Sequence, residues 1–295
     1  MKKAIGIDLG GTNIKGVIID ETGKILHQVR QPTQGETDGV WQKNIKQVHE
    51  QLQGFVKDTP LKVGLSAPGL ANASNSQISF LPNKLPGLEG FDWSKYLEVE
   101  TKVLNDAHAA LMAESAFGVM KGMKNALLVT LGTGVGGGIL LDGKLYQGRA
   151  QMAGHIGHTA IQSGGDDLSI LGMPGSLEYA LGNYSISKRS HGTFKSTYEL
   201  LDAYKIGDTF ATWMWLDMMR TLALGICSLT NIFSPEAIVL AGGLTHANDA
   251  LFVPLGEFID KFEFRPEGKK TEILKAQFSD FSGAIGAAGF ALLEA

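Results

Sequence analysis

Two glycine-rich turns in this chain have the residue types that bind phosphate groups. The segment AIGIDLGGTNIKGVIIDETGKIL (residues 4–26) returns in similar form as ALLVTLGTGVGGGILLDGKLY (residues 126–146). The matched positions are Gly10 and Gly132, Gly16 and Gly138, and Asp20 and Asp142. Each copy has the pattern of a strand, a glycine turn and a second strand, and glycine lets backbone amides approach an anion without a Cβ atom. The duplication therefore predicts two related lobes whose facing turns clamp phosphates.

The first turn also carries side chains that suit a nucleotide phosphate. Asp8 ends the first strand, where a carboxylate can hold Mg²⁺ directly or through water, and Thr12 and Lys15 are candidate donors to phosphate oxygens. A tight hairpin with polar residues facing water is an equally good explanation of an isolated DLGGT. The second turn favours phosphate binding, because five glycines in the seven residues 132–138 cost chain entropy unless close backbone approach is needed.

A polar pair, Asn105-Asp106, stands where a short strand meets a helix pattern. Capping of the helix N-terminus is the default explanation of such a pair, at about 1 kcal/mol, but capping needs only one of the two. If the turns hold a triphosphate, a carboxylate at this junction can accept a proton from a substrate hydroxyl that attacks the γ-phosphorus. Asp106 is therefore the candidate base, and the helix N-terminus favours its ionised form.

Two histidines and one acid in the following loop have weaker signals. His155 and His158 are three residues apart, but two histidines without further ligands make a weak metal site. Hydrogen bonds to a polyol or to a backbone carbonyl are the better interpretation. For Glu178 the residue pattern alone favours a solvent-facing acid on a helix.

Strand and helix patterns alternate along the chain, which favours an α/β architecture. The expected strands are a hairpin within Asp8–Leu26, then Lys62–Leu65, Glu100–Leu104, AIVLA (237–241) and Glu272–Ala276. The expected helices are Val40–Lys57, a helix from Asp106 to Gly118, Thr209–Phe233 and Gly283–Ala295. Because 295 residues exceed the usual size of one core, we expect a small lobe at 1–107 and a large lobe at 108–282. The last helix, 283–295, is expected to pack back onto the small lobe.

Composition narrows the class of partner. A net charge of −4 without a basic cluster gives no support for nucleic-acid binding, so a small molecule is expected. The single cysteine, Cys227, excludes a disulfide framework or a cysteine metal cage within the chain and fits a reducing cytoplasm. The N-terminus lacks a signal-peptide pattern. The apolar helix Thr209–Phe233 carries Asp217 and Arg220, which predicts a core helix and not a membrane span.

The ordered motifs resemble those of a known family. DLGGTNIKG, GLSAPG, LPNKLPG, NDAHAA, LGTGVGGGI, AGHIGH, GSLE and AGG are similar to the ROK family of sugar kinases and sugar-responsive repressors, within the actin-like kinase superfamily. The resemblance spans nearly the whole chain. It implies two ribonuclease-H-like (actin-like ATPase) lobes with an interlobe cleft, and transfer of the γ-phosphoryl group of ATP, with Mg²⁺, to the primary hydroxyl of a hexose.

The resemblance also implies roles for individual residues. Asp106 matches the catalytic base of the family. The positions that match phosphate and nucleotide binding are Asp8 (through Mg²⁺), Gly10, Gly11, Thr12, Lys15, Gly132, Thr133, Gly134, Gly242 and Gly243. The positions that match the sugar pocket are Gly69, Asn83, Asn105, His155, His158 and Glu178.

Two departures from the family pattern affect these expectations. The zinc loop CxCGxxGCxE is SILGMPGSLE (169–178) in this chain, so we expect no structural zinc. The rigid Pro174 and packing of apolar residues are expected to hold the loop instead; those residues are Ile170, Leu171, Met173 and Leu177. His155 replaces the glutamate of an ExGH motif, and histidine can donate where an ionised glutamate only accepts. Some bacterial N-acetylmannosamine kinases carry a similar AGHIGH, so an N-acylhexosamine is a candidate beside glucose.

Other functions within the family are less well supported. A repressor needs a DNA-binding module before the DLGGT strand, and only seven residues precede Asp8. A catalytically silent sugar sensor is the alternative left open by the altered zinc loop and His155. Family members also suggest a homodimer built through the large lobe, for which Trp213, Met214 and Trp215 are interface candidates, although core packing explains them equally well.

Overall fold

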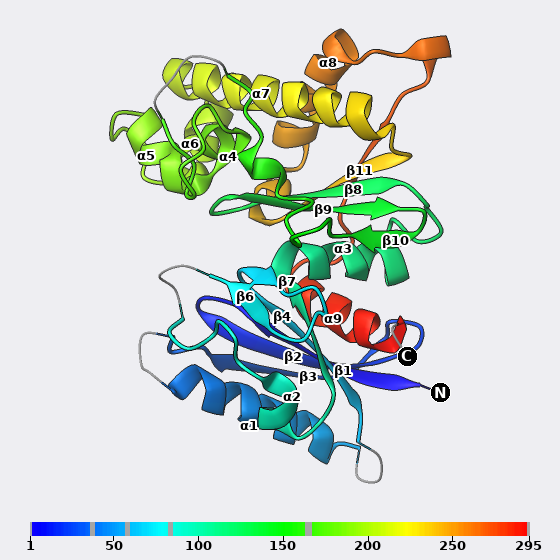
Figure 1. Ribbon diagram of the computed structural model, residues 1–295. Coiled ribbons are helices and arrows are strands. Elements are labelled where there is room, and N and C mark those ends of the chain that lie inside the picture. Colours follow the sequence, from blue (N-terminus) through cyan, green and yellow to red (C-terminus); the bar gives the residue numbers. More distant parts are fainter. Residues whose placement is uncertain (1, 36–38, 57–59, 82–84, 163–166, 294–295) are drawn as a thin grey trace. The chain divides into compact units, whose positions relative to one another are not determined.

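The computed structural model describes residues 2–35, 39–56, 60–81, 85–162 and 167–293 (Figure 1). The chain divides into two compact units, each with its own sheet. The first unit comprises Met1–Met123, Gly143–Ala153 and Ala276–Ala295, and the second Lys124–Asp142 and Gly154–Lys275.

The first unit is built on a mixed sheet with strand order β3-β2-β1-β4-β7. Its strands are β1 (Lys3–Leu9), β2 (Asn13–Asp20), β3 (Ile25–Pro32), β4 (Lys62–Ala67) and β7 (Thr101–Asn105). The first three strands pair antiparallel, while β1, β4 and β7 run parallel. A short antiparallel pair, β5 (Leu70–Ala71) and β6 (Ile78–Phe80), also belongs to this unit. Because parallel strands end at one edge, residues that follow β1, β4 and β7 meet there.

Helices cover both faces of this sheet (Figure 1). On one face α1 (Val40–Gly54) buries Trp41, Ile45, Val48 and Leu52 at helical spacing, and the indole of Trp41 packs 5.6 Å from that of Trp93 in α2 (Trp93–Leu97). On the other face α9 (Ser282–Leu293) contacts β1, β4 and α3 (Asp106–Phe117).

The contact of α9 with the sheet depends on small residues. A Cβ atom on Gly6 of β1 would lie 1.8 Å from the carbonyl oxygen of Ala284. Only glycine therefore lets the helix backbone lie against the strand. The Gly/Ala composition of α9 thus places the C-terminal helix in the first unit.

The second unit repeats the central pattern of the first. Its strands β8 (Ala126–Leu131), β9 (Val135–Leu141), β11 (Ala237–Ala241) and β12 (Glu272–Lys275) belong to a five-stranded sheet that also includes β10 (Lys144–Tyr146), with the order β10-β9-β8-β11-β12. As in the first unit, an antiparallel hairpin adjoins parallel strands. The α/β prediction is confirmed by this arrangement.

Most of the helices belong to the second unit. They are α4 (Leu177–Leu181), α5 (Ile186–Arg189), α6 (Thr197–Lys205), α7 (Thr209–Phe233) and α8 (Asp249–Phe262). Single 3₁₀ turns lie at Ile156–His158, Asn183–Ser185, Gly243–Ala247 and Pro266–Gly268. Helix α7 packs on α4, α6 and α8 and buries Met214 and Trp215 while Trp213 stays exposed, so core packing explains two of the three interface candidates. In the described part of the chain, every helix is too short or too polar to cross a bilayer.

The division differs from the predicted boundary at residue 107. Contacts place the whole of α3 in the first unit, and the division falls between Met123 and Lys124. The reason is that α3 packs along α9, a contact between segments far apart in the sequence.

Candidate functional site

The first glycine turn is held by a residue from outside the repeat. Gly10, Gly11 and Thr12 lie between β1 and β2, and the hydroxyl of Thr33 donates to the carbonyl of Gly10 at 2.6 Å. The Thr33 amide donates to the carbonyl of Thr12 at 2.8 Å. Apart from Gly11 itself and its two chain neighbours, no heavy atom of the described residues lies within 4 Å of a Cβ built on Gly11, so a phosphate can approach its amide.

Asp8 lies at the carboxyl edge of the parallel strands, opposite Ser66 of β4. The Ser66 hydroxyl donates to its carboxylate at 2.7 Å. Burial raises the pKa of Asp8 to about 6, and the charge of Asp106 adds to the rise, while Ser66 and Lys15 act in the opposite direction. A carboxylate with this excess of negative charge around it fits a divalent cation, because bound Mg²⁺ prefers carboxylate and phosphate oxygens.

Lys15 has a partner that the sequence did not indicate. Its ammonium donates to both the carboxylate and the backbone carbonyl of Asp280 at 2.8 Å, and Arg30 also pairs with Asp280. A phosphate contact by Lys15 therefore has to compete with this ion pair. Asp280 precedes α9, so the C-terminal segment contributes to the surroundings of the first turn.

The Asn105-Asp106 pair divides two roles between its members. Asn105 is the N-cap of α3, since its side-chain oxygen accepts from the amides of Ala107 and His108 at 2.9 and 3.4 Å, and its amide nitrogen donates to the carbonyl of Gly69 at 2.9 Å. Asp106 is exposed and accepts from the Ala107 amide at 2.8 Å. Because Asn105 supplies the cap, the Asp106 carboxylate lies at the helix N-terminus where a substrate can reach it.

The second glycine turn borders a pocket. Gly132 and Thr133 line a cavity of about 370 Å³ together with Gly243, Leu244 and Tyr198. Gly242 precedes Gly243 at the end of β11, which runs parallel to β8, so the two glycine motifs meet at one sheet edge. A mixed polar and apolar cavity beside an open glycine turn fits a nucleoside with its phosphates.

Glu178 is not the solvent-facing acid that the residue pattern alone favoured. It is 6% exposed, and its carboxylate accepts from the amides of Val135 at 3.3 Å and Ile170 at 3.0 Å. A Cβ on Gly134 would lie 2.3 Å from its Oε1 atom. The absence of a side chain at Gly134 thus lets Glu178 connect the glycine turn to the loop 168–173.

The loop in place of the zinc site is held by hydrogen bonds. Ser169 is 6% exposed, lies 3.2 Å from Nδ1 of His158 and accepts from the Met173 amide at 3.0 Å. The prediction of apolar packing is wrong for Ile170, Leu171 and Met173, which are exposed, and only Leu177 is buried.

The absence of zinc from this loop stays a prediction. Across the described residues, no three His, Cys, Asp or Glu side chains are placed to share a metal ion, and Nδ1 of His158 lies 3.2 Å from the hydroxyl of Ser169.

The remaining predicted sugar ligands do not all lie together. The rings of His155 and His158 are parallel, with centroids 6.1 Å apart, so both histidines belong to one cluster with Glu178, whose carboxylate lies 3.9 Å from Nδ1 of His158. Gly69 lies in the first unit beside Asn105. Asn83 lies outside the described residues.

Sequence reasoning missed four side chains that position the site. Thr33, Ser66, Ser169 and Asp280 each hydrogen-bond a predicted site residue or its turn. Ser66 lies in the motif GLSAPG and Ser169 in the segment SILGMPGSLE, so membership of these motifs was the available signal. Thr33 and Asp280 have no such signal, because each is brought in from another part of the chain.

Comparisons with known proteins agree with the motifs. The model of the ROK family matches residues 4–294. A curated glucokinase of Halalkalibacterium halodurans is 31% identical over 96% of this chain and 92% of its own length. An N-acetyl-D-glucosamine kinase of Aliivibrio fischeri is 27% identical over 96% of this chain and 97% of its own. A solved ROK hexokinase from Thermus thermophilus superposes with a TM-score of 0.85 at 27% identity, over 99% of this chain and 98% of that one. With its fold and motifs matched from end to end, this chain belongs to the ROK family.

Proposed function

We propose that this chain transfers the γ-phosphoryl group of ATP to the 6-hydroxyl of a hexose or an N-acylhexosamine, with glucose and N-acetylmannosamine as the leading substrates. The class is an ATP-dependent sugar kinase, as in the curated relatives. The alternative, a silent sugar sensor, is disfavoured because Asp106, Asp8 and both glycine turns are retained.

The observation that carries the proposal is that Asn105 and Asp106 have different roles at the start of α3. Asn105 is buried and makes the cap, so the exposed Asp106 is not needed to begin the helix. An exposed carboxylate beside Asp8 at the same sheet edge has the chemistry of a base that faces a sugar hydroxyl.

In this reaction Asp106 orients the 6-hydroxyl and accepts its proton as the oxygen attacks phosphorus. The N-terminus of α3 stabilises the ionised form of Asp106. Asn105 fixes the adjoining backbone through its contact with Gly69. Asp8 is the residue proposed to hold Mg²⁺, which supplies neutralisation of charge on the transferred phosphoryl group.

We assign nucleotide binding to the second unit. The cavity beside Gly132, Thr133 and Gly243 is proposed to take the nucleoside, and the amides of the glycine turn are proposed to donate to its phosphates. Gly134 belongs to the same turn, and a Cβ on Gly242 would lie 2.4 Å from the carbonyl oxygen of Leu131, the residue before that turn.

Sugar selectivity is proposed to depend on His155, His158 and Glu178. Two glutamate oxygens are engaged by backbone amides, so the histidines are the residues here with donors for sugar hydroxyls or an acyl carbonyl. The curated relatives include a glucokinase and an N-acetyl-D-glucosamine kinase, which supports both substrate classes. A cytoplasmic homodimer is part of the same proposal.

The test is ADP release with Mg-ATP across glucose, N-acetylglucosamine, N-acetylmannosamine, mannose, allose and fructose, run beside the Asp106→Asn protein. We expect one sugar to dominate and its turnover to disappear in the variant. Full activity of Asp106→Asn removes the assigned base, and silence with every sugar, together with retained sugar binding by calorimetry, favours the sensor.

A further inference from the structure

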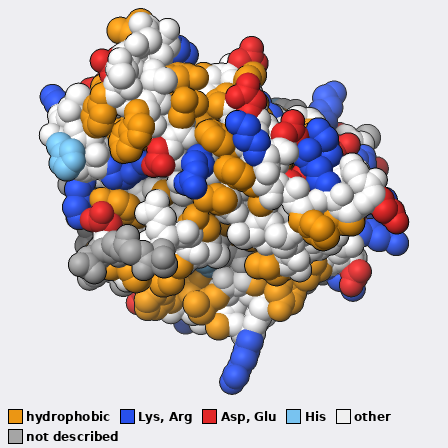
Figure 2. All heavy atoms as spheres, turned by 90° about the horizontal axis from the view of Figure 1, so that it is seen from above, with side chains coloured by type: hydrophobic (Ala, Val, Ile, Leu, Met, Phe, Trp, Pro, Cys, Tyr) orange, Lys and Arg blue, Asp and Glu red, His pale blue; other side chains and the backbone are white. Residues whose placement is uncertain are grey.

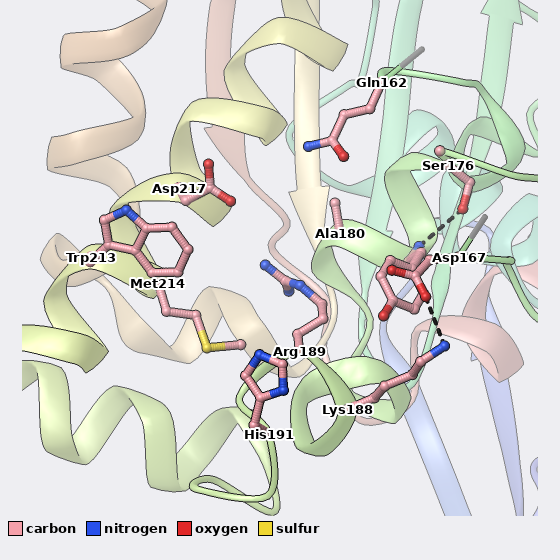
Figure 3. A pocket seen from close by; sticks show the side chains of 12 residues that line it. Gln162, Asp167, Ser176, Ala180, Lys188, Arg189, His191, Trp213, Met214 and Asp217 are labelled. Atoms are coloured by element: carbon pink, nitrogen blue, oxygen red, sulfur yellow. Dashed lines mark hydrogen bonds and ion pairs between the residues drawn. The ribbon is translucent and has the colours of Figure 1, made fainter. Parts of the chain in front are cut away.

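A second cavity in the second unit contains none of the predicted site residues. Its volume is about 430 Å³, and Figure 3 shows side chains from α5, α7 and the loop before α4 pointing into it. The cavity is distinct from the one proposed for the nucleotide, because the two share no lining residue. Nothing in the proposed kinase reaction uses it.

Arg189 of α5 is the unusual residue of this cavity. Its Nη1 atom is buried without a hydrogen-bond partner among the described residues, and its guanidinium points into the cavity toward Asp217 (Figure 3). Burial lowers the pKa of Arg189, and the charge of Asp217 is the main opposing influence. The neighbouring Lys188, in contrast, pairs with Asp167 at 2.7 Å. A buried guanidinium donor without a hydrogen-bond partner costs folding free energy. This cost indicates that the guanidinium of Arg189 is positioned to bind a ligand.

The facing wall comes from one helix. Trp213 and Asp217 are four residues apart on α7 and therefore share a face. Trp213 is 63% exposed, whereas the other three tryptophans, Trp41, Trp93 and Trp215, are 0% exposed. The indole thus offers a flat apolar surface beside a carboxylate, opposite the guanidinium (Figure 3).

We propose that this cavity binds a small anionic polyol, a sugar that bears a phosphate or a carboxylate group. The planar guanidinium of Arg189 pairs with either oxyanion through two parallel hydrogen bonds. Asp217 accepts from hydroxyls of the sugar, and the C–H face of the sugar packs on Trp213. Because Asp217 disfavours a bare anion, a ligand with hydroxyl donors is preferred over inorganic phosphate. The proposal uses no residue of the kinase site and stands apart from it.

A small ligand fits this cavity better than a highly charged polymer. Basic, acidic and hydrophobic side chains are interspersed on the face of the molecule that Figure 2 shows. The formal charges of the cavity also balance, with Lys188 and Arg189 against Asp167 and Asp217. The ligand is therefore recognised locally, by the guanidinium of Arg189 and the carboxylate of Asp217.

Tryptophan fluorescence gives a test on the full chain, because Trp213 is exposed while the other three tryptophans are buried. We would titrate a hexose 6-phosphate, a hexuronate, inorganic phosphate and the neutral hexose, and measure the same affinities by calorimetry. The expected result is saturable binding of at least one anionic sugar, weaker binding of inorganic phosphate and none of the neutral hexose at this site. The first two ligands distinguish a phosphate from a carboxylate as the anion.

Variants assign the signal to the cavity. Arg189→Gln is expected to weaken anionic-sugar binding by about tenfold or more. Arg189→Lys keeps the charge but not the planar guanidinium, so its affinity should lie between those of the parent and of Arg189→Gln. Asp217→Asn should lose the preference for the sugar over inorganic phosphate. Arg220→Gln, an exposed position on the same helix, is the matched control and should bind as the parent does.

Three outcomes overturn the proposal: no saturable binding of either anionic sugar, affinities unchanged in both Arg189→Lys and Asp217→Asn, or a Trp213 signal that follows protein concentration because a second copy covers the cavity. An anionic sugar that binds only at the proposed acceptor site would leave affinity unchanged in the Arg189 variants and weaken with added substrate. If the parent protein shows no kinase turnover but binds an anionic sugar in an Arg189-dependent way, the proposed function is rejected and the proposal for this cavity stands.

Discussion

The two copies of the repeat differ in register and in the residues at their strand ends. In the first copy Leu9 pairs with Ile14, which leaves four residues, 10–13, between the last paired positions of the hairpin. In the second copy Leu131 pairs with Val135, which leaves three, 132–134. The position of Asp8 is taken by Thr130 in the second copy, and that of Lys15 by Gly137. One repeat has therefore kept charged groups beside its turn, whereas the other offers backbone and open space.

The groups that hydrogen-bond to the carbonyls of the two turns also differ. Thr33 holds the carbonyls of the first turn, whereas the amides of Asn183 and Tyr184 donate to the carbonyls of Gly132 and Thr133 in the second, at 3.1 and 3.2 Å. In each copy two turn carbonyls accept from residues outside the turn. The first turn amide donates within it, from Gly10 to Asn13 at 3.1 Å and from Gly132 to Gly134 at 3.0 Å. The comparison shows that the same strand–turn–strand unit can suit two kinds of chemistry. With acidic side chains nearby it suits metal binding and proton transfer, and without them it suits a nucleotide.

The largest expected effect comes from removing the proposed base in the first unit. Asp106→Asn should lower kcat by about a thousandfold, because an amide cannot accept the hydroxyl proton. Asp142→Asn is the matched control in the second copy, since Asp142 is exposed with a φ of 51°, a conformation that asparagine tolerates. ADP release measures both variants, and calorimetry should find sugar binding retained. Equal activity of the two variants would refute the contrast.

The next effect concerns Asp8, which has an uncharged counterpart in Thr130. Since the folded-state pKa of Asp8 is raised from 3.8 to about 6, the folded protein binds more protons than the unfolded chain between these values. The free energy of unfolding should therefore decrease as pH rises from about 4 to about 6, by about 3 kcal/mol at most, and then level off.

Urea unfolding of the metal-free protein at several pH values tests this. Asp8→Asn, which keeps an acceptor for the Ser66 hydroxyl, should flatten the decrease. Asp106, Asp280 and Lys15 also contribute to the field at Asp8 and remain in the variant. An unchanged pH slope in Asp8→Asn would show that the shift belongs to another group.

Alanine in the two turns should separate close packing from open space. Gly134→Ala places a methyl group against the Glu178 carboxylate and should cost about 2 kcal/mol of stability, with a raised KM for ATP. Gly11→Ala meets nothing within 4 Å and should leave the melting temperature nearly unchanged. Thermal unfolding and KM for ATP report the difference. Equal melting temperatures in the two variants would remove this distinction between the turns.

The smallest effect is expected in the loop that replaces the zinc site. Ser169→Ala removes partners from the Met173 amide and from His158, which should cost about 1 kcal/mol. Ser187→Ala, at an exposed position of α5, is the control. A chelator should leave the melting temperature of the parent protein unchanged, and a clear decrease on chelation would show that a metal holds the loop.

Much of the fold was predictable because its signals are local. The hairpins follow from apolar runs interrupted by glycine, and the strand-to-helix junction at Asn105-Asp106 follows from polar residues before strong helix formers. The buried state of Glu178 was not predictable in this way, because α4 has only five residues and its helical face gives little indication of burial. The roles of Ile170, Leu171 and Met173 were misjudged for a related reason: apolar type predicts burial only where a core is available.

By itself the sequence determined the duplicated strand-turn-strand units, their α/β class and the positions of the acids next to the turns, because these depend on neighbours within a few residues. Only the tertiary structure decided which partners those residues have. Lys15 pairs with Asp280, 265 residues away, and Val135 donates to Glu178, 43 residues away. Such contacts arise when parallel strands end at one edge and a C-terminal helix packs against the first strand, and local patterns carry no information about either.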